Sequence, residues 1–283
     1  MRKTWRQESA FIAAIVLWAS QALCAQAQPQ TKTTIPSLTE FFQNLVQRYD
    51  PKSLPTTSEL LQVTRPVSKA DTREITKALP WISDAIHHQD ETVEADGAYA
   101  LLAISYRSDA TDLLNGQHEV FDRLLNTGPA RFQLGTITIL SNLRTGPTSP
   151  LFPELLKFVK QTDRDPQAQV QGVFVLAKYS PNDTEALSTI RAFASRPQAS
   201  TIRETLAHGL AMTASDNPSI QPMLLSLVHD PDASVRFTVI QALSGDALKK
   251  ALPELEKIAA DPNEESRVKE VARQAIARNN GPK

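Results

Sequence analysis

The sequence has few of the residues that support covalent or metal chemistry. Its 283 residues include one cysteine, Cys24, which lies in a segment that we expect export to remove. The mature chain would then have no disulfide, no thiol nucleophile and no thiolate metal site. Glycine is also scarce, at 9 residues, and the sequence has no glycine-rich phosphate loop, nucleophile elbow, zinc-protease motif or EF-hand loop. We therefore predict no catalytic residues, no metal and no cofactor.

An excess of charge of either sign is also missing. The formal net charge is -1, and it becomes -3 when the first 27 residues, with three basic groups and Glu8, are removed. This balance argues against a bulk attraction to nucleic acid or to an acidic membrane surface. With 41% hydrophobic residues, the chain can still bury a large core or a long stack of small ones.

Residues 1–27 have the pattern of a secretory signal peptide. A basic start precedes an apolar run over 11–19, and Ala25 and Ala27 form a small-residue cleavage site. An uncleaved membrane anchor is the alternative, but the run is shorter than the roughly 20 residues that a spanning helix needs. We expect cleavage after Ala27, a periplasmic or secreted protein, and no stable membrane span in the mature chain.

The next segments differ in composition from the rest. Residues 28–36 are polar, contain two prolines and predict a flexible leader. The segment 37–67 predicts a helix followed by a proline-rich loop, with Ser37 and Glu40 spaced as a capping box. A repeated pattern then occupies 68–278, and 279–283 form a short tail.

The repeated pattern is a helix, a turn and a second helix. We aligned the copies on the first apolar residue after each turn, which we call the anchor. The anchors are Val93, Phe132, Val170, Ile202, Val235 and Val268. Their separations are 39, 38, 32, 33 and 33 residues. The position seven residues after the anchor is small in five of six copies, and the next position is large and aliphatic in five of six, as close helix packing requires.

The first helix of each copy is also visible as an apolar segment. These segments cover 75–86, 120–125, 151–159, 186–193, 220–228 and 252–259. Residues 136–139 and 173–175 have the composition of strands, but both are in register with helical copies. We predict that they are helical, and that the chain is an all-α solenoid of about six helix pairs with an N-terminal capping helix.

At these residues the chain resembles the HEAT-repeat family, including the short HEAT-like repeats of bilin lyases. The Asp-Pro-x-x-x-Val-Arg sequence from Asp230 to Arg236 carries the resemblance most clearly, and looser copies begin at Asp165 and Asp261. The resemblance implies an α-solenoid with a groove that binds protein. It implies no single activity, since one fold carries many functions.

Two groups of polar residues admit more than one interpretation. Asp84, His87 and His88, with Asp90 or Glu91, have spacings that fit a metal site, but a helix end is the simpler explanation. The second group consists of the residues that directly follow the anchors, and it becomes basic toward the C-terminus. Its members are Glu94, Gln133, Gln171, Arg203, Arg236 and Lys269. This column is either a binding gradient or, as the family resemblance implies, a ladder of arginines that pair with turn aspartates such as Asp230.

Helical rotation predicts which side chains of the second helices face away from the core. At about 100° per residue, the positions two, six and nine residues after the anchor lie opposite the core, on the face expected to be concave. These positions include Tyr99, Leu134, Tyr179, Glu204, His208, Phe237, Gln241, Glu270 and Gln274. Of these we predict partner contacts for Tyr99, Tyr179, Glu204, His208, Phe237 and Gln241. Tyr179, His208 and Phe237 would form one patch, unless each ring packs on the neighbouring repeat.

The function that this reading favours is an exported, non-enzymatic scaffold that binds a protein or peptide. A lyase-like or cofactor-binding protein is one alternative, supported by the family resemblance alone. A structural subunit of an envelope assembly is another. The sequence leaves the oligomeric state open.

Overall fold

The computed structural model describes residues 37–47, 67, 69–214 and 217–280. The predicted signal peptide, the leader and the proline-rich loop lie outside these residues. Every regular element in the described part is a helix, including the segments 136–139 and 173–175 with strand composition. The expectation that tertiary context overrides their β propensity is therefore confirmed. No helix in these ranges is both long enough and apolar enough to cross a membrane.

The chain is an α-solenoid whose helices alternate between two layers. The first helices of the pairs are α4 (Thr72–Ile86), α7 (His118–Asp122) with η1 (Arg123–Thr127), α9 (Phe152–Lys160), α11 (Thr184–Ala194), α13 (Gln221–Ser226) and α15 (Gly245–Ala260). The second helices are α5 (Glu91–Ser105), α8 (Gln133–Asn142), α10 (Pro166–Tyr179), α12 (Ser200–Thr213), α14 (Ala233–Ala242) and α16 (Ser266–Asn280). The short helix α6 (Ala110–Leu114), which the sequence did not predict, lies between α5 and α7.

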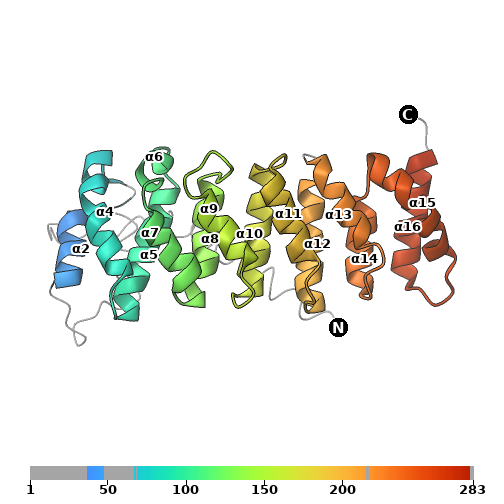
Figure 1. The fold of residues 1–283 in the computed structure, drawn as a ribbon, viewed down its shortest axis with the longest axis horizontal. Coiled ribbons are helices and arrows are strands. Elements are labelled where there is room, and N and C mark those ends of the chain that lie inside the picture. Colours follow the sequence, from blue (N-terminus) through green and yellow to red (C-terminus); the bar gives the residue numbers. More distant parts are fainter. Residues whose placement is uncertain (1–36, 48–66, 68, 215–216, 281–283) are drawn as a thin grey trace, which may run out of the picture.

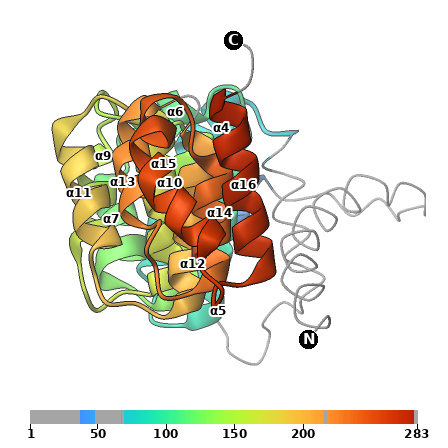
Figure 2. The ribbon, with the colours of Figure 1, turned by 90° about the vertical axis from the view of Figure 1, so that its right-hand side faces the viewer.

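The pairs follow one another in a row from the N-terminus to the C-terminus (Figure 1). Each second helix contacts the second helices before and after it, from α5 through α16. Seen along the row, α9 and α11 lie on one side and α14 and α16 on the other (Figure 2). The helix α2 (Leu38–Gln47) packs on α4 and covers the N-terminal end. We call the side of α5, α8, α10, α12, α14 and α16 that faces away from the first helices the outer face.

Aspartates begin many of the helices, as their positions in the sequence predict. Asp165 accepts hydrogen bonds from the backbone N–H groups of Gln167 and Ala168, and Asp232 accepts one from Ser234. At α2, Ser37 Oγ accepts from the backbone N–H of Glu40, and Glu40 Oε2 accepts from the backbone N–H of Ser37. This reciprocal pair is the predicted capping box.

A proline column marks the first helices, and the sequence reading missed it. Four first helices contain a proline followed two residues later by a fully buried aliphatic side chain. The prolines are Pro80, Pro153, Pro222 and Pro253, and the buried partners are Ile82, Leu155, Leu224 and Leu255. The column gives independent support for the repeat, because it comes from the helix that was not used to align the copies.

The structure corrects the register of one repeat. Helix α10 begins at Pro166 with Asp165 as its N-cap, so its third helical residue is Ala168. The third residue is also the anchor in α5, α12, α14 and α16. The predicted anchor Val170 is therefore wrong by two residues. With Ala168 as the anchor, the separations between consecutive anchors become 39, 36, 34, 33 and 33 residues. Leu176 then replaces Lys178 eight residues after the anchor, where the other copies have a large aliphatic residue.

Arginines connect consecutive pairs at the ends of the first helices. The Arg196 guanidinium donates to the carbonyl oxygens of Val159, Lys160 and Gln161, at 3.0, 2.8 and 2.9 Å, and so caps α9 from the following pair. Burial lowers the pKa of Arg196 below its usual value. Arg107 makes a similar link near α4, donating to the carbonyl of Ala70 at 2.8 Å. These bonds hold neighbouring repeats in a fixed relation.

Candidate functional site

We call the residues one place after the anchors the polar column. Its basic members Arg203 and Arg236 form ion pairs within the protein. Arg203 forms a two-pronged ion pair with Asp230 of the next pair, with its Nε 2.8 Å from Oδ2 and its Nη2 3.0 Å from Oδ1. The Asp230 side chain is 3% exposed, and its Oδ1 also accepts from the backbone N–H of Asp232 at 2.8 Å. The arginine ladder implied by the family resemblance is present at this rung.

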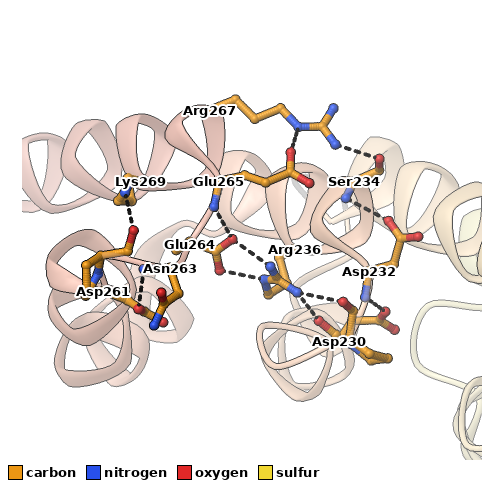
Figure 3. Close-up of polar contacts among 12 residues, drawn as sticks. Asp230, Asp232, Ser234, Arg236, Asp261, Asn263, Glu264, Glu265, Arg267 and Lys269 are labelled. Carbon is orange, nitrogen blue, oxygen red and sulfur yellow. Dashed lines mark hydrogen bonds and ion pairs between the residues drawn. The ribbon is translucent and has the colours of Figure 1, made fainter. Parts of the chain in front are cut away.

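The next rung uses a different acid (Figure 3). Arg236 donates from Nε and Nη2 to the carboxylate of Glu264, at 2.9 and 2.6 Å, rather than to the turn residue Asp261. Its Nη1 donates to the carbonyl oxygens of Asp230 and Pro231. At the last rung, Lys269 reaches only the carbonyl oxygen of Pro262, at 3.4 Å. The pairing therefore depends on which acid the following turn brings close.

In the N-terminal half of the polar column, a glutamate and two glutamines connect neighbouring helices instead of arginines. Glu94, 3% exposed, receives Arg123 at 3.0 Å and Arg131 at 3.2 Å. Gln133 accepts from the backbone N–H of Asp165. In the corrected register Gln169 takes the place of Gln171, and it donates to the carbonyl oxygens at the end of α9. The column changes along the chain from an acid to amides to bases because each residue has a different partner within the protein. This supports a structural role for the column rather than a binding gradient.

The outer face carries the exposed apolar surface. Among the described residues, the large hydrophobic side chains that are exposed are Tyr99 (43%), Leu134 (42%), Tyr106 (67%) and Met212 (70%). All four lie on second helices or, for Tyr106, on the residue that ends α5. Measured from their anchors at 100° per residue, they fall within a sector of about 80°. Apolar exposure confined to one face of a monomer is typical of an interaction surface.

Helix α10 forms a recessed part of this face. Val170 is fully buried, and Phe174 is half-buried. The Phe174 ring lies directly over Gly209 of α12, where a Cβ atom would overlap it. For Phe174 the ring packs on the neighbouring repeat, which is the arrangement that we considered as the alternative to partner binding.

Five of the six predicted contact residues lie on the outer face, on helices from α5 to α14. Tyr99, Glu204, His208, Phe237 and Gln241 lie two or six residues after their anchors, on the outer face. Their role in binding stays a prediction.

Tyr179 lies elsewhere, because in the corrected register it is eleven residues after Ala168 and turns back toward the core. Its backbone approaches Gly146, in the segment between α8 and α9, and its ring lies 5.0 Å from the Lys178 ammonium. The single patch of Tyr179, His208 and Phe237 is therefore not formed. Tyr106 and Met212, which the sequence did not predict, continue the same face, two turns beyond Tyr99 and one turn beyond His208.

The histidine pair between α4 and α5 has a local structural role. His87 Nδ1 lies 2.8 Å from the Ser83 carbonyl oxygen at the end of α4. Asp90 caps α5 by accepting from the backbone N–H groups of Thr92 and Val93. The described ranges contain no group of three or more metal-binding side chains. These contacts are those of two helix ends.

The first-helix layer carries an acidic pair and an open groove. Asp122 on α7 and Glu154 on α9 both accept from the Asn126 side-chain amide, at 3.1 and 3.3 Å, and Lys157 donates to Asp122 at 2.6 Å. Burial and the neighbouring Asp122 raise the pKa of Glu154, whereas Lys157 lowers the pKa of Asp122. A groove of about 510 Å³ opens beside them between α9 and α11. Its basic rim residues, Lys157 and Lys160, are both held in ion pairs, which indicates interhelix contacts rather than a ligand site.

A match to a protein-family model supports the repeat assignment for residues 200–277. A family model described as HEAT repeats matches residues 200–277, which span the end of the fourth pair and the last two pairs. A crystal structure described as an engineered protein is 16% identical, covers 87% of this chain and 69% of its own, and superposes with a TM-score of 0.48. No curated protein matches the sequence.

Proposed function

We propose that this chain is an exported, non-enzymatic scaffold that binds a protein or peptide partner on the outer face of its second helices. The observation that carries the proposal is the confinement of Tyr99, Tyr106, Leu134 and Met212 to that face. A few residues, with tyrosine prominent among them, contribute most of the energy in protein interfaces. Arg203 and Arg236 are held in ion pairs within the protein, which leaves these apolar side chains as the better candidates for recognition.

A double variant on this face tests the interaction. We expect Tyr99→Ser with Leu134→Ser to reduce partner capture at least tenfold, since truncation of an interface hot spot costs about 2 kcal/mol or more. Capture is measured by quantitative mass spectrometry of proteins retained from an envelope or culture fraction. The melting temperature should change by less than about 2 °C, because exposed side chains contribute little to folding.

Glu256→Ser on the first helix α15 is the control, since it places the same polar side chain at an exposed position of the opposite layer. It should retain the partners that the double variant loses. Retention of every partner by the double variant would contradict the proposed face. A partner set made only of large envelope assemblies would instead favour the alternative of a structural subunit, and retention of a bound pigment would favour the lyase-like alternative.

Export is a separate part of the proposal. The basic start, the apolar run and the Ala25 and Ala27 cleavage pattern support it. We expect the intact mass of the protein from the periplasm or medium to correspond to a chain that begins at Gln28. A mature protein that still contains Trp18 would contradict this expectation.

A further inference from the structure

Arg144 has an unusual backbone conformation directly after α8. Its φ is 52°, and among the described residues it is the one residue other than glycine with a positive φ. Its backbone N–H donates to the Ser141 carbonyl oxygen at 3.1 Å. The next N–H, of Thr145, donates to the Leu140 carbonyl oxygen at 3.0 Å. In this pattern of helix ending glycine is the usual residue, because a Cβ atom is unfavourable there, so arginine destabilises the protein relative to glycine.

The Arg144 side chain makes no contact that offsets this cost. It is exposed and forms no hydrogen bond or ion pair within the described part of the chain. Arg107 and Arg196, by contrast, donate to backbone carbonyl oxygens of another repeat. An unfavourable backbone conformation that no contact within the protein explains is typical of a residue with a role in binding.

A second base lies where the next second helix ends. Lys178, in the last turn of α10, is exposed and forms no ion pair within the described ranges, and its ammonium lies 5.0 Å from the Tyr179 ring. The chain that follows Arg144 packs against this end of α10, because a Cβ atom at Gly146 would lie 2.6 Å from the Tyr179 carbonyl oxygen. The two bases therefore belong to one stretch of the surface.

Carboxylates of the surrounding turns do not neutralise these bases. The last four residues of each of the six second helices include no aspartate and no glutamate. The acids nearest to the two bases in sequence are Glu154, Asp183 and Glu185. Glu154 accepts from the Asn126 amide, and Asp183 caps α11. Glu185 pairs with Lys160, so all three acids already have partners within the protein.

Exposed apolar side chains flank the two bases. Tyr106, which ends α5, and Met212, in the last turn of α12, are the most exposed large hydrophobic residues of the described part, at 67% and 70%. Helices α5, α8, α10 and α12 contact one another in that order. Their ends therefore carry a row of four side chains, Tyr106, Arg144, Lys178 and Met212, which we call the C-terminal edge. Two bases between apolar groups match a chain that carries carboxylates beside apolar side chains.

We propose that the C-terminal edge binds an extended acidic segment of the protein partner, whose aspartate or glutamate side chains pair with Arg144 and Lys178. This proposal rests on the proposed function and adds the chemistry of the partner. Neighbouring helices lie about 10 Å apart, and an extended chain advances about 3.3 Å per residue. The two acids would therefore be about three positions apart.

Replacement of Arg144 by glycine separates the role of its side chain from that of its backbone. We expect Arg144→Gly to raise the melting temperature by about 2–4 °C, because glycine adopts a positive φ without the Cβ penalty. Circular dichroism measures this change. A lower melting temperature would show that the side chain stabilises the fold, and it would overturn the proposal.

Selection from a random library of 12-residue peptides, displayed on phage, tests the partner chemistry with the purified protein as target. We expect the selected peptides to carry two aspartates or glutamates about three positions apart, next to an apolar residue. Their affinity, measured by fluorescence polarisation, should fall at least tenfold for Arg144→Gly and for Lys178→Gln. Lys77→Gln, which changes an exposed base on the first helix α4, should leave the affinity unchanged.

The remaining outcomes separate this proposal from the proposed function. Loss of partner capture in the Tyr99→Ser, Leu134→Ser variant but not in Arg144→Gly would keep the outer face and overturn the acidic segment. Enrichment of peptides without acidic residues would also overturn the proposal, as would a library that yields no binder. Binding to phosphatidylglycerol vesicles that is lost in Arg144→Gly, without binding to acidic peptides, would assign the edge to a lipid surface instead.

Discussion

Replacement of Asp230 by alanine should lower the free energy of unfolding by about 3 kcal/mol. The substitution leaves the Arg203 guanidinium without its two-pronged partner and removes the acceptor for the Asp232 backbone N–H. Removing one member of a buried ion pair costs about 3–5 kcal/mol, because the other charge stays buried without compensation. For a chain of this size the melting temperature, measured by circular dichroism, should fall by about 6–12 °C.

Asp246→Ala is the control for this prediction. Asp246 also pairs with a basic side chain, Lys249 at 3.0 Å, but it lies on the surface of α15 and is 86% exposed. Its melting temperature should match that of the wild type, since exposed ion pairs contribute little. If Asp230→Ala melted within 2 °C of the wild type, the polar column would have no stabilising role and Arg203 would again be a candidate for ligand binding.

Gly97→Val should be the second most damaging change. A Cβ atom at Gly97 would lie 2.7 Å from Ile86 Cγ1 and 3.1 Å from both the Ile82 oxygen and the Ile86 nitrogen. Two of these three atoms belong to the α4 backbone and cannot move aside without shifting the helix. Overpacking of this kind costs about 1–3 kcal/mol, so we expect a loss near the upper value and a fall in melting temperature of about 5–10 °C.

The same substitution at Gly135 shows how much of the stability loss at Gly97 comes from overpacking. Gly135 lies inside the second helix of the next pair, α8, and a Cβ atom there would meet nothing within 4 Å. Because glycine is a poorer helix former than valine, Gly135→Val should leave the stability unchanged or slightly raise it. Equal losses at Gly97 and Gly135 would show that α4 and α5 are not in close contact.

The repeated architecture could be predicted from the sequence because several local signals agree. Asp-Pro turns, aspartate caps and apolar spacing all place the helix starts at the same residues. The register error in α10 arose because the alignment used the first β-branched residue, Val170, and passed over Ala168. The N-cap Asp165 and the proline after it were the better guide, since they fix the start of the helix directly.

The pairing of the polar column could not be predicted in the same way. Glu94 meets Arg123 and Arg131, which follow it by 29 and 37 residues, and the sequence does not show which base reaches which acid. The choice of Glu264 over Asp261 as the partner of Arg236 likewise depends on the shape of one turn. Such contacts are set by how consecutive pairs stack, which is a property of the tertiary structure.

The outer face was only partly predictable. Rotation about each helix axis placed the exposed side chains of Tyr99 and Leu134 correctly, whereas the Phe237 ring packs partly against the core. It failed for Tyr179, where a shift of two residues turns a side chain by about 200°. It also missed Tyr106, two turns beyond Tyr99, and Met212, one turn beyond His208, whose exposure is the greatest on this face.

Site-specific photocrosslinking tests most directly whether the outer face is the interaction surface. A photoreactive amino acid is placed at Thr138, exposed on α8, and in a second strain at Ser188, exposed on the first helix α11. The cells that produce the protein are irradiated and the adducts are identified by mass spectrometry. We predict covalent adducts with a partner from position 138 and none from position 188. Adducts from position 188 alone would place the partner on the first-helix layer and contradict this account.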